Sequence, residues 1–538
     1  MPPSVIVIGA GAGGITTAAH LAKHGFKVTV VEKCSDVGGR CSLIYNNGYR
    51  FDQGPSLLLM PEVFIKTFHD LGTCLEAEGV NLLKCAPNYR IWFSDGDSFQ
   101  QSTDLAQMKS EIERYEGKEG FLRFLAFMQE AGRHYESSLT HVLRKNFPGF
   151  ASMLRPELLA AFLRMHPFES IWARVSRYFE SDKLRRVFTF ASMYLGMNPF
   201  EAPGTYSLLQ YSEVADGIWY PEGGFQKVLA ALATVGKRLG VDYRLNSPVD
   251  KVLLSERQDR VTGVRLASGE ELHADIVVVN ADLIYAYNNL LPQTSYARSL
   301  QKRPASCSSI SFFWSFDRII PELQQHNIFL ADEYQESFDA IFKRQELPKD
   351  PSFYVNVPSR LDPTAAPEGK DSVIVLVPIG HLTQGPASAL STSPENLDAL
   401  VHRARECVFA TIEARTGAKN LRERLVHEYV ETPLTWKSKF NLDRGAILGL
   451  SHSFFNVLSF RPKTKHVDIH GLYFVGASTH PGTGVPVCLS GGKVVSDQIV
   501  GEWAEGKRSR LLSHLESILF LLMPLLLCGG LYLMQLSS

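Results

Sequence analysis

The sequence predicts an α/β protein in which a Rossmann-type nucleotide-binding domain is combined with an α+β substrate domain, a helical lid and a C-terminal apolar helix. Three observations predict this fold class. A pattern of strand, glycine turn, helix and strand opens the chain at residues 5–33, short apolar strands return at 241–279 and 472–475, and an uncharged apolar segment lies at 518–534. Because 538 residues exceed the usual size of one hydrophobic core, we expect two intertwined domains with appendages.

The opening motif has the spacing of a dinucleotide site. The apolar run Val5–Ile8 suits a buried strand, and glycines follow it directly. Gly9 permits the tight turn, Gly11 lets the backbone approach a pyrophosphate, and Gly14 lets the helix pack on the sheet. The helix N-terminus then favours the phosphates. Glu32 lies 18 residues after Gly14, where a carboxylate binds the ribose. A glycine-rich turn without a ligand would leave Glu32 unexplained.

The residues after Glu32 indicate which dinucleotide the site binds. Gly38-Gly39-Arg40 brings a second stretch of backbone and a guanidinium toward the same cofactor. Nicotinamide-binding Rossmann domains do not need this extension. It resembles the Gly-Gly-Arg of flavoproteins of the amine oxidase superfamily, which implies FAD, permanently held, and makes residues 1–80 the first part of a Rossmann-type FAD-binding domain.

Composition excludes several classes of protein. The formal net charge of −1 argues against a nucleic-acid binder, which usually carries a basic excess. The eight cysteines form no CxxC pair and have no metal-ligand spacing. We therefore expect reduced cysteines and predict no metal site.

The apolar segment near the end predicts a membrane anchor. Ile518–Met534 holds 17 residues without a charge and follows a basic cluster at Lys507–Arg510. As a helix it would span roughly 26 Å. A C-terminal anchor helix at 511–536 would leave the catalytic body facing the cytosol. Two alternatives stay open: an interfacial helix broken at Pro524, and a helix buried against the protein's own core.

The middle of the chain alternates between helical and strand patterns. Residues 105–139 and 156–192 are predicted to be largely helical, as a lid or membrane-docking surface rich in aromatic and basic side chains, or as an ordinary helical cap. The loop Ile218–Gly224 has two glycines that would let it approach a planar ring. The other predicted elements are a hairpin at 41–51, helices at 62–71, 225–239 and 391–416, and strands at 81–99, 241–245, 248–252, 262–266, 276–279, 308–316, 353–357 and 373–377.

A second small-residue loop follows the last predicted strand. Gly476 begins it, Thr483–Pro486 ends it, and a helix comes next, at 489–499. Strand, small-residue loop and helix N-terminus make another cradle for an anion or for the pyrimidine edge of a flavin. A glycine-rich turn alone is the alternative, but the loop repeats the design of the first motif.

Four stretches together resemble one family. They are the fingerprint with its Gly-Gly-Arg and residues 202–225, 445–466 and 471–487. These are similar to carotenoid phytoene desaturases of the bacterial and fungal type, within the flavin amine oxidase superfamily, and most to the fungal branch. The resemblance implies that the ADP half of FAD is bound by Gly9, Gly11, Gly14, Glu32, Gly39 and Arg40. It implies the adenine at Val249 and the ribityl and ring side at Gly476, Thr483, Gly484, Val485 and Pro486.

The same resemblance implies FAD-dependent dehydrogenation of 15-cis-phytoene to lycopene or more desaturated carotenoids, by successive hydride transfers to flavin N5. The alternatives are a flavin oxidase or desaturase of another terpenoid or of an amine, and a non-enzymatic escort for isoprenoids. The proton acceptor is unknown. There are four candidates. Glu213, Asp216 and Glu222 flank the expected active face, with a solvated surface acid as the alternative for each, and His480 lies in the second small-residue loop.

The expected partners are a lipid-soluble polyene and a membrane, and the sequence leaves open whether the chain forms a homo-oligomer. Oxygen or a membrane quinone is the expected terminal acceptor, and NAD or NADP is a third candidate although no second GxGxxG is present. We expect the remaining parts at 81–240 (helical, membrane-docking), 241–285 (return to the FAD domain), 286–440 (substrate-domain sheet and helices) and 441–505 (C-terminal FAD-binding part).

Overall fold

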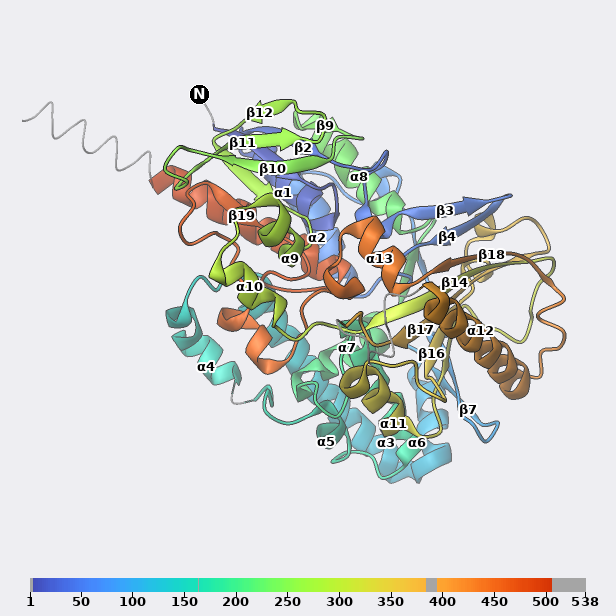
Figure 1. Cartoon of the computed structure of the whole chain (residues 1–538). Helices are drawn as coiled ribbons and strands as arrows, with labels where there is room; N and C mark the ends of the chain where they lie inside the picture. Colours follow the sequence, from blue (N-terminus) through green and yellow to red (C-terminus); the bar gives the residue numbers. More distant parts are fainter. Residues whose placement is uncertain (1–2, 163, 384–393, 506–538) are drawn as a thin grey trace, which may run out of the picture.

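Two large β-sheets and a helical region make up the structure (Figure 1). It is a computed structural model that describes residues 3–162, 164–383 and 394–505. The chain passes back and forth between the two sheets, so that each sheet collects strands that are far apart in the sequence.

The first sheet is parallel and has five strands. Its order is β19 (Leu472–Phe474), β13 (Ile276–Val279), β1 (Ser4–Ile8), β2 (Lys27–Val31) and β9 (Asp242–Arg244). Because side chains alternate along a strand, Val5 and Val7 pack on the side of helices α1 (Ala12–Lys23) and α8 (Phe225–Arg238). Ile6 and Ile8 pack instead with the antiparallel sheet β10 (Val249–Leu254), β11 (Val261–Leu266) and β12 (Glu271–His273). The predicted Rossmann core is thus covered on both faces.

The second sheet is mixed and has seven strands. Its order is β18 (Leu425–Glu431), β14 (Ser308–Phe316), β17 (Asp371–Ile379), β16 (Phe353–Asn356), β15 (His326–Phe329), β6 (Tyr89–Trp92) and β7 (Ser98–Gln101). Helix α12 (Pro394–Thr416) covers one face (Figure 1), where the Trp314 and Phe409 rings stack 4.4 Å apart. The opposite face turns toward a cavity, because Phe313 points away from Trp314 along the same strand.

The helices of residues 105–187 lie in the lower part of the molecule as drawn in Figure 1. The predicted long helix is present as α3 (Leu105–Ser138). The second run predicted as largely helical instead forms short helices: α4 (Pro156–Phe162), α5 (Ile171–Val175) and α6 (Asp182–Val187), with the 3-10 turn η5 (Phe190–Leu195). Pro167 follows His166, which has a positive φ of 48°, and Ser170 caps α5 by accepting from Ala173 N–H. A proline and a new N-cap both end helical continuity.

The remaining elements connect these layers. They are β3 (Leu43–Asn46), β4 (Tyr49–Asp52), α2 (Pro61–Leu71), β5 (Leu82–Lys84), α7 (Leu208–Tyr211), β8 (Trp219–Pro221), α9 (Leu283–Tyr285), α10 (Ser295–Gln301), α11 (Tyr334–Asp339), α13 (Pro433–Phe440) and a last helix over 485–505. The 41–51 segment is the expected hairpin, with Asn47 and Gly48 at its turn. The 218–224 segment was predicted as loop alone; its middle pairs with β5 as β8.

Across the described residues, every helix is too short or too polar to span a membrane. The anchor predicted at 511–536 lies outside the described residues, so it stays a prediction.

Candidate functional site

A cavity of about 540 Å³ lies between the two large sheets. The carboxyl ends of β1, β2, β13 and β19 open on it from one side. Strands β14, β16 and β17 and turn η5 line it from the other. Ligands bind at the carboxyl ends of strands in open parallel sheets, and this cavity is in that position.

The glycine turn after β1 is packed too closely for side chains. A Cβ on Gly14 would lie 2.1 Å from the Gly9 carbonyl oxygen, and Gly9 has a φ of +98°. A Cβ on Gly9 would also meet the Asn280 carbonyl oxygen at 2.8 Å. The turn therefore holds the N-terminus of α1 directly against the end of β1. Gly11, the N-cap of α1, supplies no side-chain cap, so backbone N–H groups of the first turn are available to an anion.

Glu32 stands beside this turn at the end of β2. It is 6% exposed and lines the cavity. Its carboxylate accepts hydrogen bonds from Ala10 N–H at 2.6 Å and from Cys34 N–H at 2.9 Å. These two donors fix the carboxylate at the place where the fingerprint expects a ribose diol.

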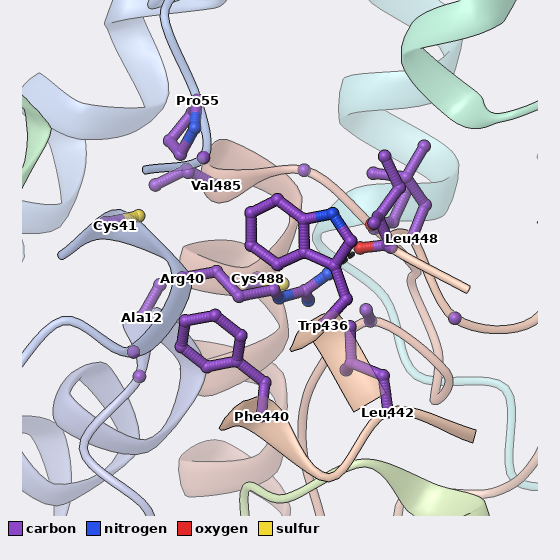
Figure 2. A pocket seen from close by; sticks show the side chains of 18 of the residues that line it. Ala12, Arg40, Cys41, Pro55, Trp436, Phe440, Leu442, Leu448, Val485 and Cys488 are labelled. Atoms are coloured by element: carbon purple, nitrogen blue, oxygen red, sulfur yellow. Dashed lines mark hydrogen bonds between the residues drawn. The ribbon is translucent and has the colours of Figure 1, made fainter. Parts of the chain in front are cut away.

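The Gly-Gly-Arg segment packs on the first motif. Gly38 N–H donates to the Ala10 carbonyl at 2.8 Å. Gly39 has a φ of +56°, and a Cβ on it would lie 3.5 Å from Gly11 Cα. Arg40 donates to the Ile447 carbonyl oxygen. Figure 2 shows its side chain extending across the pocket toward Trp436 and Leu448. At least one of its five donors is thus used within the protein.

The second small-residue loop lies against the same cavity. His452 Nε2 accepts from Thr483 N–H at 3.1 Å, and a Cβ on Gly482 would approach that nitrogen to 2.3 Å. Arg461 is fully buried beneath the loop, and its guanidinium donates to backbone carbonyls of both flanking segments: Thr479, Ser451, Asn456, Leu450 and Ala477. Burial lowers the pKa of Arg461 to about 10. The hydrogen bonds from the buried Arg461 guanidinium therefore fix the position of the loop.

The structure brings all of the predicted cofactor residues except Gly14 to the wall of this cavity. Gly14 lies behind the turn that it shapes. These features fit a dinucleotide that carries a flavin: an uncapped helix N-terminus, a fixed buried carboxylate, closely packed glycine backbone and a second small-residue loop opposite. Binding by the individual residues stays a prediction.

Sequence reasoning missed Asn280, Arg461 and His452. The Asn280 amide donates to the Val475 carbonyl at 2.9 Å, and its atoms lie against Gly9, Gly11 and Gly14. It thereby joins β13, β19 and the glycine turn. A polar residue directly after an apolar parallel strand is a signal that could have identified it. No comparable local signal marks Arg461 or His452.

The other end of the cavity is apolar. Where it meets the nucleotide end, Trp436 and Phe440 of α13 lie with Leu442 and Leu448 near Arg40 (Figure 2). Further apolar side chains come from both sheets and the helical region: Phe190, Met193, Leu195, Leu209, Phe313, Ile328, Leu330, Phe338, Phe353, Ile374 and Leu376. The apolar walls continue directly from the nucleotide end, so a hydrophobic ligand could lie against a bound flavin ring.

None of the four predicted proton acceptors is among the residues that line the cavity. Glu222 is exposed and accepts from the Asn81 amide at 3.0 Å. Asp216 is half-buried, which raises its pKa. His480 is buried with Nε2 against the Lys145 carbonyl at 2.8 Å, and burial lowers its pKa to about 4. Glu213 is fully buried behind the cavity wall, connected to wall residue Tyr194 through the Tyr89 hydroxyl.

A cluster of metal-ligand type lies apart from this cavity. Glu130, His134 and His166 bring their ligand atoms within 4.8 Å of one another. The Glu130 carboxylate already accepts from Arg174 and Tyr178, and both His134 nitrogens have hydrogen-bond partners. The cluster is therefore explained as an ion pair with its supporting hydrogen bonds.

Comparison with known proteins identifies relatives over nearly the whole chain. The family described as flavin containing amine oxidoreductase matches residues 12–500. Phytoene desaturase of Fusarium fujikuroi is 60% identical over 509 residues, covering 92% of this chain and 89% of that one. Phytoene desaturase of Neurospora crassa is 58% identical, covering 93% and 85%. A zeta-carotene-forming phytoene desaturase of Myxococcus xanthus is 38% identical, covering 94% and 95%.

Solved structures share the fold at low identity. An oxidoreductase from Methanosarcina mazei superposes with a TM-score of 0.61 at 17% identity, covering 92% of this chain and all of that one. Wild-type putrescine oxidase bound to putrescine superposes with a TM-score of 0.59 at 15% identity, covering 93% and 99%. The resemblance found in the sequence motifs is confirmed: the chain belongs to the flavin containing amine oxidoreductases, in the group that holds the fungal phytoene desaturases.

Proposed function

We propose that this protein uses FAD to desaturate 15-cis-phytoene to lycopene or to a more desaturated carotenoid. The observation that carries the proposal is the continuity of the cavity, in which a nucleotide end built from glycine backbone and Glu32 passes directly into an apolar end. The identity of 50–60% to fungal phytoene desaturases supports the same substrate class.

The residues around the cavity divide the work. When bound, FAD supplies the hydride acceptor. The glycine turn, Glu32 and the loop braced by Arg461 hold the nucleotide. The apolar walls bind a polyene, orient its allylic carbon and exclude water, so that positive charge developing on the chain is not captured by solvent. This scheme needs a proton acceptor within reach, but no charged nucleophile at the reacting carbon.

The test is conversion of phytoene by the full-length protein, loaded with FAD and reconstituted in liposomes. Extracted pigments are separated by chromatography and identified by absorbance. Coloured polyenes would support the proposal, and their end point would count the desaturation steps. Unchanged phytoene with FAD bound, under air and with quinone and NAD(P) each supplied, would overturn it. Other terpenoids and amines would then be tried as substrates. Comparing these oxidants identifies the terminal acceptor, for which we propose oxygen or a membrane quinone.

We also propose that the protein works on a membrane surface with its catalytic body in the cytosol. An exposed aromatic patch supports this proposal. Phe168 is 77% exposed, Phe455 73% and Phe150 65%, and their rings are linked through Phe454 and Phe460 at centroid distances of 4.7–5.8 Å. Leu154 and Leu159 are also exposed, on the neighbouring segments 150–154 and α4. Aromatic side chains clustered on a surface favour an interface with lipid.

Vesicle flotation tests this second proposal. Because the tail at 518–534 is a separate predicted anchor, the Phe168→Ser and Phe455→Ser pair is made both in the wild-type chain and in a chain whose tail carries Leu521→Arg and Leu526→Arg. We expect flotation to fall in steps and to be lost only when both regions are changed. Tyr45→Ser is the matched control, since this exposed aromatic lies on hairpin β3–β4, distant from α4 (Figure 1). Unchanged flotation of the fully substituted chain would overturn the proposal.

A further inference from the structure

Two tyrosine hydroxyls form a hydrogen-bonded line from the cavity wall to a buried carboxylate. Tyr194 of η5 lines the apolar end of the cavity. Its hydroxyl donates to the Tyr89 hydroxyl at 2.6 Å. The Tyr89 hydroxyl in turn donates to Glu213 Oε1 at 3.1 Å. The three residues come from segments 89–92, 190–195 and 212–216, so only the folded chain brings them into line.

The direction of donation matters. Both phenol protons point toward Glu213, which leaves the lone pairs of the Tyr194 oxygen as the accepting end of the line. A proton taken up at Tyr194 can therefore be passed inward by exchange of the two existing protons, without rotation of either ring. Ordered chains of hydrogen-bonded hydroxyls also polarise one another, which eases such a transfer.

Glu213 is built to receive a single proton. It is 0% exposed, and its second oxygen accepts from Gln101 Nε2 at 3.1 Å. Its carboxylate accepts from the Tyr89 phenol and the Gln101 amide, and within the described residues no ion pair to it is present. Burial raises its pKa to about 7, while the hydrogen bonds from Gln101 and Tyr89 lower it. A carboxyl with this pKa takes up and releases a proton near neutral pH.

Two further titratable groups, His326 and Tyr354, lie near Tyr89. The His326 ring centroid is 6.0 Å from that of Tyr89, and His326 Nδ1 lies 2.7 Å from the Tyr354 hydroxyl. Tyr354 also lines the cavity. Burial lowers the pKa of His326 to about 3, so its imidazole stays neutral in the physiological range. The pair of Tyr354 and His326 is arranged like Tyr194, Tyr89 and Glu213, with a tyrosine at the cavity wall and a titratable group behind it. Unlike Glu213, His326 does not take up a proton near neutral pH.

We propose that Glu213 is the acceptor of the proton that the substrate loses, reached through Tyr194 and Tyr89. The proposal rests on the proposed function, in which bound FAD would supply the acceptor for the hydride that leaves one carbon. The neighbouring carbon then loses H⁺, and its C–H electron pair becomes the second bond of the new C=C. The Tyr194 oxygen gains that H⁺ and gives its own proton to Tyr89. Tyr89 gives its own proton to the Glu213 carboxylate, which becomes neutral.

The pH dependence of turnover is the first test. Because the acceptor must be unprotonated, the wild-type rate should rise with pH and level off above about pH 7. In Glu213→Gln this limb should disappear, and the maximal rate should fall by about 10²-fold or more. Tyr194→Phe interrupts the line at the cavity and should have the same two effects. Tyr354→Phe is the matched control: whatever its effect on the rate, it should keep the wild-type pH limb.

A second measurement needs no turnover. Infrared difference spectra of the FAD-free and FAD-loaded protein, recorded as pH is raised, should show a protonated carboxyl band that disappears near neutral pH. That band should be absent in Glu213→Gln and shifted in Tyr89→Phe, which removes its hydrogen-bond donor. Flavin absorbance and thermal melting verify that each variant is folded and loaded.

The outcomes separate the two claims. A wild-type enzyme that converts phytoene while Glu213→Gln and Tyr194→Phe keep its pH limb would overturn the relay and leave the proposed function standing. A band that persists in Glu213→Gln would overturn the assignment of the titrating group. Unchanged phytoene with the wild type would overturn the proposed function, and the proton role of Glu213 with it.

Discussion

The two ends of the cavity are built in opposite ways. At the nucleotide end the backbone makes the contact surface, and residues matter because of what they lack: a Cβ on Gly14 would lie 2.1 Å from a carbonyl oxygen. At the apolar end the side chains make the surface, and strands β14, β16 and β17 supply it on one face while α12 covers the other. The nucleotide end is therefore specified by consecutive residues of the sequence, and the apolar end only by the assembled fold.

The largest expected effect is at Gly14. In Gly14→Val the new side chain would drive α1 away from the turn at Gly9, and no small rearrangement relieves contact with backbone. We expect protein that neither binds FAD nor folds stably, measured by flavin absorbance and thermal melting. Gly501→Ala is the control, because a Cβ there meets nothing within 4 Å. A folded, FAD-loaded Gly14→Val protein would contradict the claim that this end is fixed by steric exclusion.

The second effect is expected at Glu32, the one charged side chain on which the fingerprint depends. Glu32→Gln keeps the shape but removes the charge that would bind the ribose. Because hydrogen bonds to charged groups contribute about 1.5–3 kcal/mol, the Kd for FAD should rise about 10- to 100-fold. Equilibrium titration of the FAD-free protein measures it. An unchanged Kd would mean that the hydrogen bonds to Ala10 and Cys34 are the whole role of Glu32.

Much of this first end could be predicted from the sequence, and the reason is physical. A turn that must lack side chains leaves a consecutive run of glycines, and a parallel strand leaves a consecutive apolar run. Arg461, His452 and the line through Tyr89 leave no such local pattern. Apart from Asn456, five residues from Arg461, the partners lie 10 to 124 residues away. The cavity wall at Leu376 is equally invisible, since both faces of β17 are apolar and only packing distinguishes them.

Two adjacent residues of β17 sharpen the comparison at the apolar end. Leu376 lines the cavity and Val375 packs under α12. Leu376→Ala should widen the cavity and change the KM for phytoene or the number of desaturations, with little loss of stability. Val375→Ala should instead lower the free energy of unfolding by about 1–3 kcal/mol while the product distribution stays the same. Pigment chromatography measures the product distribution of each variant, and denaturant unfolding measures its free energy of unfolding. The same product change in both variants would mean that the face of β17 under α12 also determines the shape of the cavity.

The smallest effect is expected at Gly39, where glycine is required for a different reason from that at Gly14. Its φ of +56° is unfavourable for other residues, but a Cβ would lie at an ordinary 3.5 Å from Gly11 Cα. In FAD-free protein Gly39→Ala should therefore cost only about 1 kcal/mol, and Gly39→Asn less, because asparagine tolerates this conformation. FAD affinity provides the contrast: if the cofactor lies on Gly39, both variants weaken binding equally, since both add a Cβ. Unchanged FAD affinity in both variants would instead place the cofactor away from Gly39 and restrict the steric requirement to the turn around Gly14.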